Sequence, residues 1–535
     1  MSEIVVTAAA PTVAGARRVP ILRDFVRTVH VTTDPALTRR YLLLAEGGEC
    51  TEIRRSESER VLRAQPFLAD ASVLAYDAGD GTVRIEVHTI DEVSFLAGAR
   101  MSGNSPYLGR LRLGNTNLMG QGLLVSGEWR SGGNHRDGYA LSFADYQLAG
   151  QRWIASLDMR RDLLGGNWRA EISRPFLTDL QRDAWRMHGG TSTDYVHLQR
   201  NDDVTRAVPV RREFADVGVI TRIGPPRRLG LLGVSLSHER ERTGSEVLLV
   251  DRWGARPDSV PLEQSFAPHT MGRVNLLGGV RLLDFVRVRG FDGLSATQDF
   301  PVGLQAGVVV GRSTPMLGAI DDDWLTSFDL YAARGSEHQA TRIELTGEGR
   351  YDRPANRWDG IVASGAIAHY AKVGDANTTV LSAEWAGMWH PRVPGWLDLG
   401  ARDGGMRGFA GADDGGARRA VVRAEQRRVL GRVNGTAEFG AALFVEGGRV
   451  WKGESPWGVT TPWRSAFGAS LLAAVPVRSA RLWRIDLAIP STGGGIRHWE
   501  VRVSRASPRS PATEQSSPLD AMRARAVPGS VFRWP

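Results

Sequence analysis

Apolar and polar side chains alternate along most of this chain, and this period of two constrains the fold more than any other feature. In LWRIDLAI (residues 482–489), a tryptophan and three aliphatic residues share one side of an extended chain, whereas Arg484 and Asp486 lie on the other. TRIELTGEGR (residues 341–350) repeats the pattern, and similar stretches separated by turn signals continue through residues 107–504. Their length of roughly ten residues exceeds that of strands in soluble sandwiches and matches the ~9–11 residues with which a tilted strand crosses a bilayer.

A closed barrel accounts for both faces of these strands. Its apolar face meets lipid, its polar face lines a lumen, and closure pairs every backbone group. Many of the 16 tryptophans fall near candidate strand ends, where an aromatic belt would place them; the alternative is that they are core aromatics. The longest apolar run, residues 466–477, is too short for a spanning helix of ~20 residues. The sequence therefore predicts a mainly β protein, with a transmembrane antiparallel β-barrel of about sixteen strands over residues 97–505.

Charge and cysteine content exclude some classes of function. The formal net charge is +8, but Lys372 and Lys452 are the only lysines, and the arginines are dispersed among acidic residues. Without a basic patch or a motif, this pattern indicates no nucleic-acid partner, and arginines paired inside a polar cavity explain it better. The single cysteine, Cys50, excludes an intrachain disulfide and does not locate the protein.

The segment 22–96 has a different organisation and predicts a small α+β domain. A strand is expected at residues 24–33, followed by a helix with Asp34 as N-cap and a proline at its first position. A second helix is expected within residues 51–67, and two alternating strands joined by a glycine turn come next. The predicted order is strand, helix, helix, strand, strand.

The two ends of the chain are expected to lie outside these domains. Residues 1–21 contain an apolar stretch, but Glu3 stands where a signal peptide has positive charge. They are expected to be either a disordered tail or the remnant of a signal peptide that begins upstream. Residues 506–535 are expected to form a disordered C-terminal tail.

The stretch DGGMRGFAG (residues 403–411) places one cation, Arg407, among glycines. A loop that folds back into a barrel needs glycines for tight turns and an anchoring group in the polar lumen. An arginine fork can hold two carboxylates. On the following candidate strands, Glu425 and Glu446 lie on faces that can point inward. Arg407 is therefore interpreted as the tip of a lumen-inserted loop that these carboxylates hold.

Three local patterns give the chain a family resemblance. YLGRLRLGNTNLMGQGLLVSGEW (residues 107–129) contains an Asn-Leu-x-Gly-x-Gly turn, and RAEISRPFL (residues 169–177) ends a strand in an aromatic after proline. The third pattern is the loop motif of an apolar residue followed by Arg-Gly-Phe: Met406, Arg407, Gly408 and Phe409. In this order the patterns resemble the barrel of the BamA/TamA superfamily of bacterial outer-membrane insertases and secretion pores.

The strands that follow the loop extend the resemblance. That family has an acidic residue on the next strand and then a strand bearing Phe-x-Asp-x-Gly. Here the corresponding residues are Glu425, Phe444, Glu446 and Gly448, so Glu446 replaces the usual Asp. About five strands remain after the loop, as in the family, and the segment 22–96 resembles a POTRA domain.

The resemblance implies a function that is not enzymatic and needs no cofactor, metal or catalytic residue. Unfolded outer-membrane or secreted polypeptide clients would add a strand to the POTRA-like domain in the periplasm and pass to the barrel in the outer membrane. Accessory periplasmic or lipoprotein partners are not identifiable. A single POTRA-like unit departs from the principal assembly insertase, which carries several.

Other interpretations remain open. The barrel can be a passive pore or structural barrel, or a membrane-embedded enzyme acting on lipid. Val288-Arg289-Gly290-Phe291 is a second Arg-Gly-Phe, but no similarly ordered acidic strands follow it, so residues 288–291 are predicted to be a strand end. His135 near a hairpin tip lacks a nucleophile elbow, and the triplet Asp321–Asp323 lacks the spacing of a calcium loop and is expected to be solvated. The histidines show no metal-ligand spacing.

Overall fold

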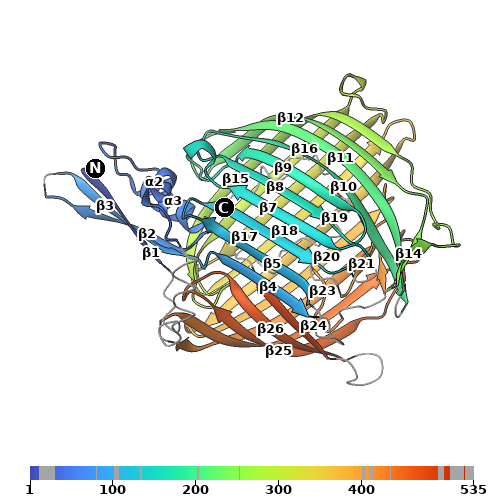
Figure 1. Ribbon diagram of the computed structural model, residues 1–535. Coiled ribbons are helices and arrows are strands. Elements are labelled where there is room, and N and C mark those ends of the chain that lie inside the picture. Colours follow the sequence, from blue (N-terminus) through green and yellow to red (C-terminus); the bar gives the residue numbers. More distant parts are fainter. Residues whose placement is uncertain are drawn as a thin grey trace.

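The computed structural model describes residues 1–10, 31–79, 81–101, 108–132, 135–201, 204–251, 253–400, 404–409, 414–433, 435–491, 499–506 and 523. They form a small α+β domain attached to one end of a large barrel (Figure 1). None of the helices in these ranges is long and apolar enough to span a membrane.

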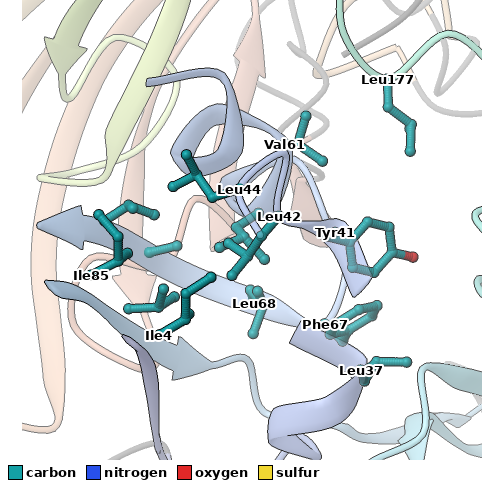
Figure 2. Close-up of a cluster of buried hydrophobic side chains, with 14 residues drawn as sticks. Ile4, Leu37, Tyr41, Leu42, Leu44, Val61, Phe67, Leu68, Ile85 and Leu177 are labelled. Atoms are coloured by element: carbon teal, nitrogen blue, oxygen red, sulfur yellow. The ribbon is translucent and has the colours of Figure 1, made fainter. Parts of the chain in front are cut away.

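The small domain is a three-stranded sheet covered by two helices. Its elements are β1 (Glu3–Ala9), α2 (Pro35–Tyr41), α3 (Glu52–Arg63), β2 (Leu68–Asp77) and β3 (Val83–Asp91). The strand order is β1-β3-β2, with β1 parallel and β2 antiparallel to β3. Apolar side chains from both helices and all three strands form one buried core (Figure 2).

The predicted helix starts are confirmed. The Asp34 side chain accepts a hydrogen bond from the backbone N–H of Ala36 at 2.8 Å, and Thr51 caps α3 through the N–H of Arg54 at 3.4 Å. Each cap satisfies one N–H that the helix itself leaves unpaired. The predicted hairpin is also present as β2 and β3.

The prediction that residues 1–21 lie outside the domain is wrong for their first part. Residues 3–9 form β1, and Ile4 is buried in the domain core opposite Ile85 of β3. The hydrophobic residues that suggested a signal remnant therefore serve as a strand of the sheet. The strand predicted at residues 24–33 lies outside the described residues up to residue 30, and residues 31–33 are not in a strand.

The barrel is closed, and from β4 through β27 each wall strand is antiparallel to the next one in the wall. Its first strands are β4 (Phe95–Met101), β5 (Leu108–Leu118), β6 (Leu123–Arg130), β7 (Gly138–Asp145), β8 (Ile154–Arg161), β9 (Gly166–Arg174), β10 (Asp183–Asn201), β11 (Val204–Ile223) and β12 (Leu229–Thr243). The middle strands are β15 (His269–Arg289), β16 (Thr297–Ser313), β17 (Asp323–Gly335), β18 (Gln339–Asp352), β19 (Arg357–Val373) and β20 (Asn377–Trp389). The last are β23 (Arg418–Val433), β24 (Ala437–Trp451), β25 (Arg464–Ala474), β26 (Leu482–Pro490) and β27 (Glu500–Ala506).

The predicted number of about sixteen strands is wrong. Among the described residues the sheet has 22 strands, of which β13 (Leu248–Asp251) and β14 (Gly254–Pro257) form a hairpin in the connection from β12 to β15. Because β12 pairs directly with β15, the remaining 20 strands surround the lumen. An alternating sequence looks the same in a wall strand and in a loop hairpin, so surplus strands could not be assigned from sequence. The barrel bounds, Phe95 to Ala506, lie within two residues of the predicted 97–505.

The two faces of the wall differ as the alternation predicts. Large apolar side chains such as Leu232 on β12 and Leu276 on β15 are exposed on the outside. Their sequence neighbours on the inner face are polar and largely buried, as with Arg273 and Asn275 of β15. This arrangement is that of a transmembrane β-barrel with a polar interior.

The small domain docks on the turns at one end of the barrel through its helices (Figure 1). Tyr41 donates a hydrogen bond to the carbonyl of Tyr146 in the β7–β8 connection at 2.7 Å, and Arg60 donates to the carbonyl of Leu177 after β9 at 2.8 Å. Arg63 pairs with Asp299 of β16 at 2.6 Å. We call this the domain end of the barrel, and the opposite end the loop end.

The turn of the first family-like pattern belongs to the same contact. Asn117 donates from its side-chain amide to Thr33 at 2.8 Å and accepts from the N–H of Gly122 at 2.7 Å. Gly120 has φ +70°, and a Cβ there would lie 2.3 Å from the Thr32 carbonyl oxygen. Glycine is therefore required where this turn meets the domain.

We expect acid to loosen this docking. Burial alone would raise the pKa of Glu59 on α3, but Arg63, the backbone N–H of Val73 and the charge of Arg287 on β15 of the barrel together hold the pKa below its ordinary value of 4.5. A carboxylate with a lowered folded pKa stabilises the folded state above its unfolded pKa, and this contribution is lost as the pH falls through the folded value. Protease protection of residues 31–91 should therefore fall below about pH 4.5, and Glu59→Gln should reduce both the protection at pH 7 and its pH dependence. Equal protection at pH 7 and pH 3 would contradict this.

Candidate functional site

The connection between β20 and β23 folds back into the barrel from the loop end. It contains a two-stranded pairing of β21 (Leu397–Asp398) with β22 (Gly415–Gly416). Leu399, Met406 and Phe409 of this loop form a buried cluster with wall residues of β23, β24 and β25. The remainder of the predicted stretch 403–411, namely residues 403, 410 and 411, lies outside the described residues. The predicted insertion of this loop is thus present in the structure.

Arg407 is held by carboxylates of the wall. Its Nε donates to Glu446 Oε1 at 2.8 Å, and its backbone N–H donates to Oε2 of the same carboxylate at 2.7 Å. Its Nη1 lies 3.2 Å from Glu425 Oε2 and 3.1 Å from Asp486 Oδ1. The guanidinium also lies over the ring of Phe444, 3.4 Å from the centroid. Of the residues predicted to hold the loop, Glu425, Phe444 and Glu446 therefore contact Arg407 directly.

The glycines of the motif make space for the loop. A Cβ on Gly448 would lie 2.5 Å from Met406 Sδ, so a side chain there would push against the inserted loop. Gly408 has φ +86°, which favours glycine, and its N–H donates to Glu500 Oε2 at 2.6 Å. Both predicted glycines thus have a steric or conformational role at the loop tip.

Sequence reasoning missed part of the carboxylate set. Asp486 on β26 and Glu500 on β27 contact the motif, and Arg484 bridges Asp486 and Glu425 at 3.2 and 2.8 Å. The signal was present, because Arg484 and Asp486 were assigned to the polar side of their strand. Periodicity gives the face of a strand but not which strands lie opposite an inserted loop, so the link to Arg407 could not be made.

The same loop has a second arginine anchor that sequence reasoning also missed. Arg392 donates from Nη1 to Asp323 of β17 at 3.0 Å and from Nε to Asp359 of β19 at 2.8 Å. Asp323 also pairs with Arg273 at 3.1 Å. The expectation that Asp321–Asp323 is solvated is therefore wrong for Asp323, whose side chain is buried among two guanidinium groups.

Three connections meet at the loop end. Trp396 packs with Leu198 of β10, Val208 of β11 and Val247 of the β12–β15 connection. Ser455 of the β24–β25 connection donates to the carbonyl of Gly395 at 2.6 Å. The inserted loop thus contacts both the β10–β11 wall and the β23–β26 wall, and so crosses the lumen.

The second Arg-Gly-Phe ends a strand, as predicted, but it also enters the barrel. β15 ends at Arg289, which is exposed. Phe291 is fully buried, stacks on Tyr370 at a centroid distance of 5.0 Å and accepts a hydrogen bond at its carbonyl from Arg427 at 2.8 Å. Because Arg427 also pairs with Glu425 at 2.5 Å, this turn touches the outer shell of the Arg407 cluster.

The remaining candidates have structural partners. The ring of His135 contacts the Asp251 carbonyl at 2.8 Å, and Asp321 pairs with His269 at 3.2 Å. Within the described ranges, no group of three or more metal-ligating side chains is placed to hold a metal ion. The strongest chemical feature of the site is the set of ion pairs that Arg407 makes with Glu425, Glu446 and Asp486, which we call the clasp.

No protein-family profile matches the sequence, and no curated protein does. Similar solved structures include BamA from Haemophilus ducreyi lacking POTRA domains 1–3 (11% identity over 94% of this chain and 83% of that chain, TM-score 0.38) and CdiB from Escherichia coli (13% identity over 94% and 74%, TM-score 0.42). The outer membrane protein OpdK from Pseudomonas aeruginosa is also similar (12% identity over 77% and 95%, TM-score 0.30). At these TM-scores the likeness does not assign the chain to a family, and the fold rests on its own strand pairing.

Proposed function

We propose that this chain is a bacterial outer-membrane barrel that inserts or translocates unfolded polypeptide, with its small domain on the periplasmic side. The closed wall with an apolar outside and a polar inside supports the membrane location. The proposed activity is not enzymatic. The POTRA-like character of the domain and the BamA/TamA-like loop motif belong to this proposal.

The observation that supports the proposal is a three-stranded sheet with two unpaired edge strands, positioned at the domain end of the barrel. The helices α2 and α3 dock on the barrel end, whereas β1 and β2 each pair with β3 alone among the described residues. An unpaired strand edge binds an extended peptide through backbone hydrogen bonds. Leu74 and Tyr76 on β2 expose apolar side chains beside such an edge. A client bound there would lie next to the turns that lead into the barrel.

The test is site-specific photo-crosslinking in the whole protein reconstituted in lipid. A photoreactive phenylalanine analogue at Tyr76 should crosslink to an unfolded outer-membrane polypeptide, and a strand-forming peptide should compete. The control is the same analogue at Trp253, an exposed aromatic next to the β13–β14 hairpin. Equal labelling at both positions, or none at Tyr76, would reject client binding and leave the passive pore or structural barrel and the lipid-acting enzyme as the alternatives.

A further inference from the structure

The interior of the barrel is unevenly filled. On the side formed by β15 to β26, many inward-facing charged side chains are sequestered: Arg273 and Asp323 are each 1% exposed, and Glu348 and Glu446 likewise. Arg287, near the domain end of β15, is an exception at 53%. Arg523 of the C-terminal segment adds to this filling, because it lies 3.4 Å from Ser327 of β17 and 3.7 Å from Glu348 of β18. Ion pairs and the inserted loop thus occupy this side.

The wall from β5 to β9 is different. Its inward-facing Arg169 and Asp158 form a pair whose side chains are 53% and 41% exposed, and Arg110 and Arg130 are 36% and 33% exposed. Strand register places them on the lumenal face, since Asp158 is opposite Ser142 and Arg169 while the intervening Met159 is exposed on the lipid side. Charged side chains on an inner face stay this accessible only where water reaches them.

This sector is also positively charged. Its described inward-facing cations are Arg110, Arg112, Arg130, Arg160 and Arg169. Its inward-facing anions are Glu128, Asp158 and Glu171. On the strands themselves, five cations against three anions give a formal net charge of +2, and Asp162 of the β8–β9 turn also pairs with Arg130 at 3.2 Å. Rings of arginine are the means by which pores attract anions.

Both ends of the sector fit a passage. At the loop end, β8 and β9 are joined by a short turn, residues 162–165, whereas the long crossing loop is anchored on the walls that begin at β10. At the domain end, the β5–β6 and β7–β8 turns carry the docked domain. A route along this sector would therefore begin beside the small domain at the domain end. It would reach the loop end alongside the inserted loop, without crossing it.

We propose that β5 to β9 line a water-filled route through the barrel, off its centre, that prefers anions over cations. The route does not depend on polypeptide transport, because it follows from the accessibility and charge of the wall alone. A small inorganic anion such as chloride is the probe, and an acidic solute would be attracted by the same groups.

Conductance of single-cysteine variants in planar bilayers tests the position of the route. In a Cys50→Ser background, the variants are Ser142→Cys on the inner face of β7, Leu141→Cys beside it on the lipid face, and Ser327→Cys on the filled side. A water-soluble anionic methanethiosulfonate should reduce the current through Ser142→Cys and leave the other two unchanged. Block at Ser327→Cys without block at Ser142→Cys, or absence of any conductance, would overturn the proposal.

Reversal potentials in a salt gradient test the charge preference. The unaltered barrel should show a chloride-to-potassium permeability ratio above one. Arg112→Glu with Arg169→Glu changes the sector from +2 to −2, and the ratio should fall below one. Arg240→Glu with Arg353→Glu, two exposed arginines outside the sector, changes the total charge equally and should leave the ratio above one. Heat-dependent gel mobility checks that each variant is folded, and an unchanged ratio in the first pair would refute the preference.

Discussion

Replacing Arg407 by alanine should release the inserted loop while leaving the barrel closed. In the described part of the chain, Arg407 is the only guanidinium within 3.5 Å of Glu446, since Arg423 lies 3.7 Å away. Glu425 keeps Arg427 and Arg484, so it loses less. Leaving one buried carboxylate without its partner costs about 3–5 kcal/mol in the free energy of unfolding. The measurement is the urea midpoint of the heat-modifiable gel band in lipid, together with protease cleavage of the loop.

Coupling between the partners separates the clasp from a general loss of stability. Glu446→Gln should give a milder defect of the same kind, and the double variant with Arg407→Ala should cost less than the two single changes together, because both remove one ion pair. Arg289→Ala is the matched control, since it alters the arginine of the other Arg-Gly-Phe and its side chain is exposed. Additive effects of Arg407 and Glu446 would show that Arg407 does not depend on this carboxylate.

Replacing Asp323 by alanine should have an effect of similar size at the other anchor of the loop. The carboxylate serves Arg273 at 3.1 Å and Arg392 at 3.0 Å, and the side chains of all three are nearly inaccessible. Two guanidinium groups would lose a shared partner, which we expect to cost about 3–5 kcal/mol. Arg392 retains Asp359, so the loss should fall mainly on Arg273.

The adjacent aspartate supplies the control for this prediction. Asp322 pairs with Arg353 at 3.2 Å and also with Arg312, but the side chains of all three are between about a third and a half exposed. An exposed ion pair contributes only about 0–1 kcal/mol, so Asp322→Ala should leave the urea midpoint nearly unchanged. Equal effects of the two substitutions would show that the buried arginines do not rely on Asp323.

The sequence predicted the fold class because a period of two records the environment of each face directly. Arg484 and Asp486 were assigned to the polar side of their strand, and both lie in the lumen. The number of strands could not be predicted in the same way, because the β13–β14 hairpin and a wall strand carry the same local signal. Residues 3–9 were misassigned because their partner strand lies some eighty residues away. The two strands pair in parallel, so no short turn between them indicates the pairing in the sequence.

The site shows the same division between local and distant information. Arg407, Glu425 and Glu446 could be connected because glycines, an arginine and two acidic strands follow one another in the chain. Arg392 could not, since nothing near it in the sequence indicates that it contacts Asp359 on β19, the strand beside β20, and Asp323 on β17. Phe291 was classed correctly as following a strand end, but its burial against Tyr370 depends on a strand about eighty residues later.

The two anchors of the inserted loop differ in when their partners are synthesised. Arg392 binds Asp323 and Asp359, which precede it in the chain, so this contact can form as soon as the loop exists. Arg407 binds Glu425, Glu446 and Asp486, all of which follow it. A nascent chain that stops before β26 therefore carries a cation whose last partner has not been made. The charge of Arg407 is therefore fully neutralised only when the C-terminal strands have joined the wall, so the inserted loop reaches its final contacts only in the completed barrel.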